Sequence, residues 1–247
     1  MLKVFSSDRS SNHPDGVNRL VLLRHGQSIW NRDKKLTGWS DIPLSLKGEK
    51  EAEQAAFLLK QAGYTFDLCF TSVLQRAQTT AHIVLSSMQL DIPVIEDWRL
   101  NERHYGALEG MERWAAIKRF GIWPLLGCQI KFDASPPFLS HLDPRYPGNQ
   151  SRYAEIGQNE LPLGESMQQA HARISPYWHE TIKPQIQLGK RILIVSHRNT
   201  LRILMMLLDD LTPVQVMALK MPTGRPLVYE LEQQSSSVRH YYLDHLE

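Results

Sequence analysis

Short apolar runs with the composition of strands alternate along the chain with longer stretches that are apolar on one face only. The strand-like runs are residues 19–23, 66–71, 93–96, 191–195 and 227–231. Parallel strands need crossover connections, which the helical stretches between these runs would provide. We therefore predict an α/β fold of three α/β/α layers, in which helices cover both faces of a mostly parallel central sheet.

Capping residues place the helices between these runs. Ser45 is expected to cap a helix over residues 46–62, which Gly63 would end. Ser72 and Gln75 have the spacing of a capping box, so a helix is expected to open there. The other expected helices cover residues 109–120, residues 166–182 from a Ser166 cap, the stretch around 201–208, and a short helix capped by Thr212 and Pro213.

The length of 247 residues, 42% of them hydrophobic and 22% charged, is typical of a globular protein with a sizeable core. Residues 1–17 are mostly polar, so we expect a flexible N-terminal tail without a secretory signal. Residues 18–247 are then expected to form a single domain. Within it, residues 121–161 are rich in Pro, Gly, Ser and Asp, which predicts an irregular insertion that either acts as a lid or stays disordered.

Charge and cysteine usage exclude several classes of partner. The formal net charge of +2 gives no reason to expect nucleic acid or a membrane surface. The longest apolar run, residues 203–208, is too short to span a bilayer. Cys69 and Cys128 lie far apart and match no metal or redox spacing, and the histidines show no metal-binding spacing. We therefore expect reduced thiols, no metal and a cytoplasmic location.

The first strand-like run ends in Arg24, His25 and Gly26. Ligands of α/β proteins are usually held at such strand ends. Arginine binds phosphate oxygens through two parallel hydrogen bonds, neutral histidine is a competent nucleophile near pH 7, and glycine lets the backbone approach a ligand. These residues suit the binding and attack of a phosphoryl group, although the tripeptide alone also fits an ordinary strand end with a solvated arginine.

Three other positions place suitable groups near the ends of predicted elements. Arg76 lies in the first turn of the helix after the second strand, where free N–H groups favour anions. His197 follows the run over 191–195, so two strands would each deliver a histidine to one phosphate. Glu102 has the chemistry of a general acid/base if burial favours its neutral form. Each residue also has a plain structural interpretation, as a surface arginine, a buried hydrogen-bonded histidine and a paired surface carboxylate.

Together, these segments resemble the cofactor-dependent phosphoglycerate mutases of the histidine phosphatase superfamily. Arg24-His25-Gly26 marks the superfamily, while Thr37-Gly38-Trp39 and the run from Asn101 to Leu108 point to the mutase branch. The similarity extends from about Arg19 to Leu243. It implies an isomerase of glycolysis and gluconeogenesis that interconverts 3-phosphoglycerate and 2-phosphoglycerate through a phosphohistidine. It also implies 2,3-bisphosphoglycerate as the primer, no metal, and a homo-oligomer, commonly a dimer.

The resemblance implies a role for each matching position. His25 would be the phosphorylated nucleophile and Glu102 the general acid/base. Arg24, Arg76 and His197 would complete the catalytic phosphate pocket. The positions expected to bind substrate are Ser28, Asn31, Thr37, Gly38, Tyr105, Arg113, Arg198 and Asn199.

The chain departs from the family at three places. Arg113 stands where the family usually has lysine, which keeps the charge but changes its geometry. Gln129 and Ile130 align with a pair of arginines that grip the substrate. Losing two charged hydrogen bonds of about 1.5–3 kcal/mol each would weaken substrate binding by several kcal/mol. Arg198 follows the second histidine in place of a glycine, where it either supplies a missing charge or blocks the pocket.

Three functions are compatible with these residues. The first is phosphoglycerate mutase activity. The second is a phosphatase that uses His25 and Glu102 in the same roles but transfers the phosphoryl group of another phosphomonoester to water. The third is a non-catalytic homologue that keeps only the anion-binding pocket. The acceptor, glycerate or water, distinguishes the two enzymes, and binding without turnover would identify the third function.

Overall fold

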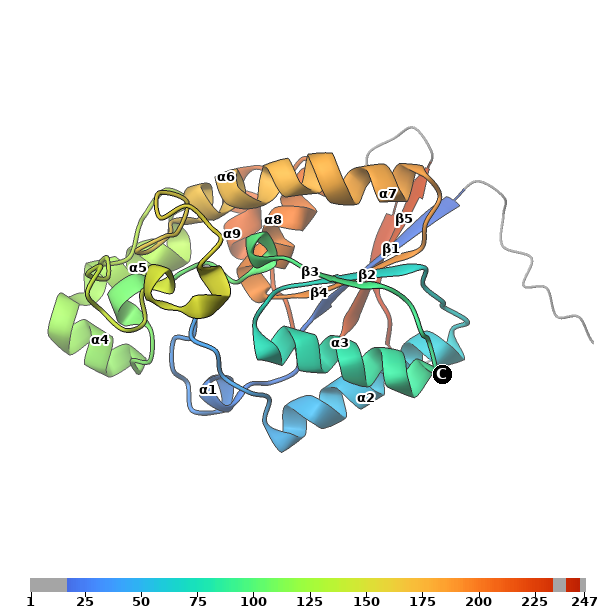
Figure 1. The fold of residues 1–247 in the computed structure, drawn as a ribbon, viewed down its shortest axis with the longest axis horizontal. Coiled ribbons are helices and arrows are strands. Elements are labelled where there is room, and N and C mark those ends of the chain that lie inside the picture. Colours follow the sequence, from blue (N-terminus) through green and yellow to red (C-terminus); the bar gives the residue numbers. More distant parts are fainter. Residues whose placement is uncertain (1–16, 233–238, 245–247) are drawn as a thin grey trace, which may run out of the picture.

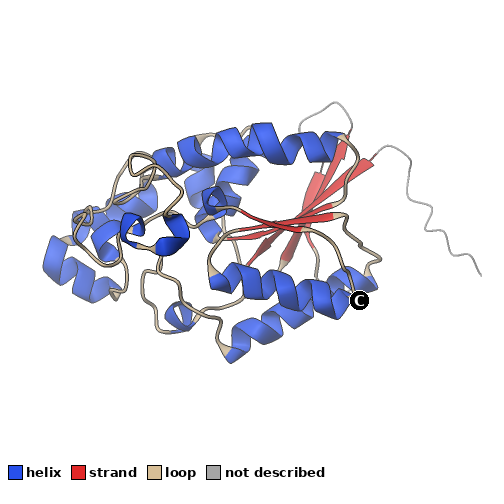
Figure 2. Cartoon of the chain, viewed as in Figure 1, coloured by secondary structure: helices blue, strands red, loops and turns tan. Residues whose placement is uncertain are grey.

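The computed structural model describes residues 17–232 and 239–244, in which six strands form a mixed sheet between two layers of helices (Figures 1 and 2). The strands are β1 (Val17–Arg24), β2 (Leu68–Thr71), β3 (Val94–Glu96), β4 (Ile192–Ser196), β5 (Pro226–Glu232) and β6 (Arg239–Tyr242). Their order across the sheet is β3-β2-β4-β1-β5-β6. The first four pair in parallel, and β5 runs antiparallel to both of its neighbours. The predicted α/β architecture is confirmed.

Each face of the sheet has its own group of helices, as Figure 1 shows. One face is covered by α2 (Leu46–Gln61) and α3 (Gln75–Met88). The other face carries α6 (Met167–Tyr177), α7 (Lys183–Gln187), α8 (Arg198–Asp209) and α9 (Pro213–Ala218), with a π-helical turn (Trp178–Ile182) between α6 and α7.

Burial on both faces explains why the strand runs are continuously apolar. Successive side chains of a strand point to opposite faces of the sheet. In β1, Leu20 and Leu22 belong to the core under α6 and α8. Val21 and Leu23 belong to the core under α2 and α3. A polar residue at any of these positions would therefore be buried, whichever face it met.

Shorter helices gather beyond the end of β1 that carries Arg24. They are α1 (Ile29–Arg32), α4 (Arg113–Phe120), α5 (Ile122–Ile130) and the 3-10 turns Trp98–Leu100, Gly106–Leu108, Pro147–Asn149 and Ser151–Tyr153. α4 and α5 lie at the left of Figure 1, at the opposite end of the molecule from the start of β1. These segments form a cap over the strand ends at which ligands of α/β proteins usually bind.

Three predicted helix starts are confirmed by their capping contacts. The Ser45 side chain accepts a backbone N–H of the first turn of α2. Ser166 and Gln169 form a capping box at the start of α6. Thr212 caps α9 through a second box, with a proline at the first helical position. Local side-chain chemistry thus determines where these helices begin.

The structure corrects two predicted boundaries. Residue 17 lies in β1, so it does not belong to a tail, and the rest of the predicted tail, residues 1–16, lies outside the described residues. The helix expected over residues 109–120 begins only at Arg113. Glu109 instead follows a separate 3-10 turn, Gly106–Leu108, in an extended conformation. Its side chain accepts hydrogen bonds from the distant loop of Trp39 and Ser40 and from the nearby Tyr105.

Three further predictions need correction. The helix after β2 is present, but its N-cap is Leu74, which has no side-chain cap. Ser72 does not cap this helix, and its hydroxyl lies 2.7 Å from Nε2 of His197 instead. The segment predicted to be irregular contains α5, whose Leu125 packs with Leu108 and Ala116. β6 was not expected, because its stability comes from pairing with β5 rather than from a pattern of its own.

Candidate active site

The ends of β1 and β4 bring two histidines together. The two strands are parallel neighbours, with Arg24 opposite Ser196. The backbone N–H of His25 donates to the carbonyl oxygen of Ser196 at 2.9 Å. His25 and His197 therefore leave adjacent strands side by side, and their ring centroids are 5.0 Å apart. The predicted meeting of two histidines at one sheet edge is confirmed.

His25 is held as a neutral imidazole. Its Nδ1 lies 2.7 Å from the carbonyl oxygen of Gly26. Because a carbonyl oxygen only accepts, Nδ1 carries the proton and Nε2 keeps its lone pair. Burial, followed by the positive charges of Arg76 and Arg24, holds the pKa of His25 well below its ordinary value of 6.5. The ring is therefore uncharged at neutral pH, with Nε2 available for attack.

Gly26 fixes the backbone beside His25. A Cβ at this position would lie 2.1 Å from the carbonyl oxygen of Gly48, at the start of α2. The N–H of Gly26 donates to Oγ1 of Thr80 in α3 at 3.1 Å. The two helices on this face of the sheet thus hold the loop that orients His25.

His197 is the N-cap residue of α8 and is fully buried. Its Nε2 lies 2.7 Å from the hydroxyl of Ser72, while its Nδ1 is buried without a hydrogen-bond partner. Burial, and then the charge of Arg76, hold the pKa of His197 well below 6.5. Ser72 was missed as a site residue, because its sequence context was interpreted as a helix cap.

Two arginines supply positive charge on either side of the histidines. Arg76, in the first turn of α3, is buried and donates to the carbonyl oxygens of Gly38 and Ser40 at 2.7 and 2.9 Å. Burial lowers the pKa of Arg76 to about 10, so it stays charged at neutral pH. Arg24 donates through Nη1 to the carbonyl oxygen of Met221 at 2.7 Å, and its Nε is buried without a partner. A buried, unpaired guanidinium N–H favours an anionic ligand.

Glu102 is buried, and its side chain contacts the first turn of α8. Its Oε1 accepts the backbone N–H groups of Arg103 at 2.9 Å and of Asn199 at 3.1 Å. Asn199 also donates through Nδ2 to the hydroxyl of Tyr105 at 3.0 Å. The carboxylate is thus fixed in place beside the phosphate pocket, where it can exchange a proton with a bound hydroxyl group.

A cavity of about 150 Å³ lies at these strand ends, and His197 is not among the residues that line it. The predicted site residues in its wall are Arg24, His25, Asn31, Thr37, Gly38, Arg76, Glu102, Tyr105 and Arg198. Ser28 does not line this cavity, since it is buried as the N-cap of α1 in a capping box with Asn31. The volume suits a phosphoryl group and a small part of the molecule that carries it.

A larger cavity of about 500 Å³ adjoins the first, and the two share Asn31, Lys35, Leu36, Tyr105 and Arg198 in their walls. The cationic residues that line it are Lys34, Lys35, Arg103, Arg113, Arg198 and Arg202, and none of its described lining residues is acidic. Such a wall attracts a second negative group on the same ligand. Sequence reasoning missed Lys34, Lys35, Arg103 and Arg202, whose only signal was their position within or beside the motifs.

Arg103 is the most enclosed of these cations, with 2% of its surface exposed. The guanidinium of Arg103 lies 4.7 Å from the centre of the Tyr105 ring. Its Nε and Nη1 atoms are buried and have no hydrogen-bond partner among the described residues. In the wall of the same cavity, Arg113 donates through Nη2 to Oε1 of Gln129 at 2.5 Å. Gln129 thus orients a cation, although it carries no charge itself.

The structure adds three observations on the other predicted properties. Among residues 17–232 and 239–244, no group of three or more His, Cys, Asp or Glu side chains is arranged to hold a metal ion. Within the same residues, none of the helices has both the length and the hydropathy that crossing a membrane requires. Cys69 and Cys128 are buried and unbonded.

Comparisons with known proteins match this geometry. The Histidine phosphatase superfamily (branch 1) matches residues 20–137 and 140–244. The chain is 58% identical over 226 residues, 91% of its own length and 97% of the relative, to a 2,3-bisphosphoglycerate-dependent phosphoglycerate mutase 1 of Nitrosomonas europaea.

Two solved structures share the fold. A candidate α-ribazole-5′-phosphate phosphatase from Escherichia coli gives a TM-score of 0.72 at 24% identity, over 92% of this chain and 96% of that one. A mycobacterial glucosyl-3-phosphoglycerate phosphatase gives 0.67 at 23% identity, over 91% and 97%. The chain belongs to the histidine phosphatase superfamily and, within it, to the family of 2,3-bisphosphoglycerate-dependent phosphoglycerate mutases.

Proposed function

We propose that this protein is a phosphoglycerate mutase that interconverts 3-phosphoglycerate and 2-phosphoglycerate through a phosphohistidine at His25. The observation that carries the proposal is the pair of adjoining cavities. One places a neutral histidine between two arginines and a carboxylate, and the other is lined by cations. A three-carbon substrate with a phosphate and a carboxylate matches that distribution of charge.

In the proposed reaction, phosphorylated His25 gives its phosphoryl group to the free hydroxyl of the bound substrate. The Nε2–P bond breaks, an O–P bond forms, and Glu102 takes the hydroxyl proton. Nε2 of His25 then attacks the other phosphoryl group, and Glu102 returns the proton to the oxygen that leaves. Arg24 and Arg76 stabilise the charge on the transferring group throughout.

The residues present fit 2,3-bisphosphoglycerate as the primer. The unpaired buried N–H groups of Arg24 and Arg103 lie in the walls of adjoining cavities, as a ligand with two phosphates requires. When bound, the primer supplies the phosphoryl group that charges His25. Arg24 and Arg76 would hold one phosphate, and Arg103 would hold the other.

The remaining predicted residues have roles in substrate binding in this proposal. Arg198, the first residue of α8, lines both cavities and would bind the second anionic group in place of the family's middle arginines. Arg113, oriented by Gln129, lines the larger cavity as well and would bind the same group. Tyr105 and Asn199 would contact the carbon chain. Thr37 and Gly38 would line the phosphate pocket beside Asn31, and Ser28 would act only by shaping the loop.

A phosphatase is the second candidate. Gln129 and Ile130 line the larger cavity where cations would be expected for a mutase, and this observation favours a different phosphomonoester. The pocket around His25 would act in the same way, with water as the final acceptor.

We also propose a cytoplasmic homodimer. β3 lies at the edge of the sheet, and Val94 and Ile95 are 43% and 37% exposed there. Pairing of two such edges would cover apolar side chains and unpaired backbone groups. The two unbonded cysteines suit a reducing compartment. Sedimentation equilibrium of the wild type and of Ile95→Lys tests the dimer, and cell fractionation tests the compartment.

The test of the main proposal is conversion of 3-phosphoglycerate with and without catalytic 2,3-bisphosphoglycerate, with phosphate release measured in parallel. Fast isomerisation that needs the bisphosphate supports the mutase. Phosphate release without isomerisation supports the phosphatase instead. Binding of phosphate with neither reaction would indicate a non-catalytic homologue.

A further inference from the structure

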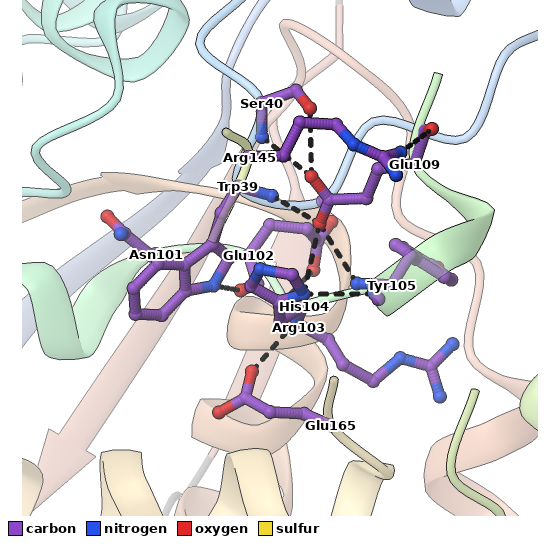
Figure 3. Close-up of polar contacts among 12 residues, drawn as sticks. Trp39, Ser40, Asn101, Glu102, Arg103, His104, Tyr105, Glu109, Arg145 and Glu165 are labelled. Atoms are coloured by element: carbon purple, nitrogen blue, oxygen red, sulfur yellow. Dashed lines mark hydrogen bonds and ion pairs between the residues drawn. The ribbon is translucent and has the colours of Figure 1, made fainter. Parts of the chain in front are cut away.

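Glu109 is a buried carboxylate outside both cavities, with 2% of its surface exposed. Figure 3 shows its side chain between the loop that contains Trp39 and Ser40 and the loop that runs from Glu102 to Tyr105. Both loops carry residues of the catalytic cavity. Neither the family resemblance nor the reaction described above gives Glu109 a role.

The carboxylate accepts hydrogen bonds from both loops. Oε1 accepts the backbone N–H groups of Trp39 at 2.9 Å and of Tyr105 at 3.1 Å. Oε2 accepts the backbone N–H and the hydroxyl of Ser40 at 3.0 and 2.8 Å. Nδ1 of His104 also lies 3.3 Å from Oε1, but it accepts the backbone N–H of Gly106 at 2.9 Å and donates nothing to the carboxylate. A carboxylate is an acceptor at both oxygens, so it satisfies the donors of Trp39, Ser40 and Tyr105 at once.

These contacts lead directly to catalytic groups. The carbonyl oxygens of Gly38 and Ser40 hold the guanidinium of Arg76. The indole Nε1 of Trp39 donates to the carbonyl oxygen of Glu102 at 2.5 Å. Glu109 therefore fixes, through two short connections, the arginine that grips the phosphate and the proposed acid/base.

The close approach of the Glu109 carboxylate to the backbone explains why residue 38 is a glycine. Gly38 has a φ of +57°, and a Cβ there would lie 1.8 Å from Oε1 of Glu109. The other loop, from Glu102 to Tyr105, is held in addition by Glu165. This carboxylate accepts the N–H of His104 at 2.8 Å and forms an ion pair with Arg173. The backbone oxygen of Glu109 accepts from Nη1 of Arg145 at 2.7 Å, so the segment predicted to be either a lid or disordered is anchored at the same point.

We propose that Glu109 is a positioning residue whose charge sets the distance between the phosphate-gripping loop and the acid/base loop. It acts through Trp39 and Ser40 and touches no substrate. In Glu109→Gln, an amide NH₂ replaces one carboxylate oxygen and faces either the N–H groups of Trp39 and Tyr105 or the N–H of Ser40. At least one loop must then move, and displacements of about 1 Å cost on the order of 100-fold in rate.

The test compares kcat and KM for Glu109→Gln, Glu109→Asp and the control Glu112→Gln. Glu112 is exposed on the same loop, and among the described residues its carboxylate accepts a hydrogen bond only from the indole of Trp114. We expect Glu109→Gln to lower kcat by about 10- to 100-fold while KM changes less than about threefold. Glu109→Asp keeps the charge and should recover part of kcat, and Glu112→Gln should match the wild type.

Unchanged kcat in a folded Glu109→Gln, or an Asp variant no better than Gln, would overturn the proposal. If Glu109→Gln does not fold, Ser40→Ala takes its place, because it removes one of the same hydrogen bonds. We expect it to lower kcat by a smaller factor. A kcat equal to that of the wild type would contradict the proposal. This inference rests on the proposed function. If the proposed function fails, the wild type itself shows no mutase activity. The ratio of variant to wild-type kcat is then measured with p-nitrophenyl phosphate, whose phosphoryl group would bind in the same pocket.

Discussion

The imidazole of His25 lies with its centroid 5.0 Å from that of His197, at an interplanar angle of 59°. Both rings are buried, and both are close enough to Arg76 for its charge to oppose their protonation. The pair therefore stays neutral beside a cavity whose wall carries more positive than negative side chains. A neutral nucleophile among fixed cations is suited to a reaction in which the negative charge comes with the ligand.

His25→Ala should abolish phosphoryl transfer, because it removes the Nε2 atom that carries the phosphoryl group. The measurement is incorporation of labelled phosphate from the bisphosphate together with mutase turnover. His82→Ala, which changes an exposed histidine of α3, is the control and should keep wild-type activity. Activity of His25→Ala above background would contradict the phosphohistidine mechanism.

The free energy of unfolding should fall as the pH is lowered below about 6.5. Both histidines have folded-state pKa values well below 6.5, so in this range the unfolded chain binds protons that the folded chain does not. Each such group contributes up to about 1.4 kcal/mol per pH unit between its folded pKa and 6.5, and nothing above 6.5. Urea unfolding at pH 5 to 8 measures this slope.

His197→Gln isolates one of these groups, since glutamine can keep a hydrogen bond to Ser72. Its stability should vary less steeply with pH than that of the wild type. Inorganic phosphate should also flatten the wild-type curve, because a bound anion favours the imidazolium forms. Parallel slopes for the wild type and His197→Gln would show that His197 is not held neutral by the fold.

Glu102→Gln should lower kcat by about 100- to 10,000-fold with little change in substrate affinity. The amide oxygen can still accept the N–H groups of Arg103 and Asn199, but the group no longer exchanges a proton. Phosphorylation of His25 by p-nitrophenyl phosphate should be affected far less, because its leaving group needs no proton. An equal loss on both substrates would indicate that Glu102 only shapes the pocket. Glu155→Gln, on the surface, is the charge-matched control.

Sequence reasoning succeeded where a local pattern determines the structure. Continuous apolar runs place β1 and β4 in a sheet buried on both faces, and this alone brings His25 and His197 to one edge. Side-chain caps such as Ser45 likewise depend on residues a few positions apart. These features are decided within short segments, so they can be predicted without knowledge of the tertiary fold.

The parts that were missed depend on contacts between distant segments. Ser72 reaches His197 across 125 positions of the chain, and Glu109 binds Trp39 across 70. α5 was expected to be irregular because its proline and glycine outweighed its apolar residues, yet packing of Leu125 against α4 stabilises it. Tertiary contacts override local propensity in each of these cases.

Arg198→Gly should raise the KM for 3-phosphoglycerate by about 10- to 100-fold, the range expected for loss of one charged hydrogen bond of about 1.5–3 kcal/mol. Arg198 is exposed at the start of α8 and lines both cavities, so its guanidinium can reach the second anionic group without filling the phosphate pocket. The measurement is steady-state mutase kinetics at fixed ionic strength.

Arg198→Lys keeps the charge but not the planar fork and should give an intermediate KM. Arg119→Ala, which removes an exposed cation from the end of α4, should leave KM unchanged. If glycine at position 198 instead lowers KM, the arginine obstructs the site, and Arg113 and Arg103 must bind the second anion alone. That result would favour a natural substrate other than phosphoglycerate, because an arginine at this position would then select against it.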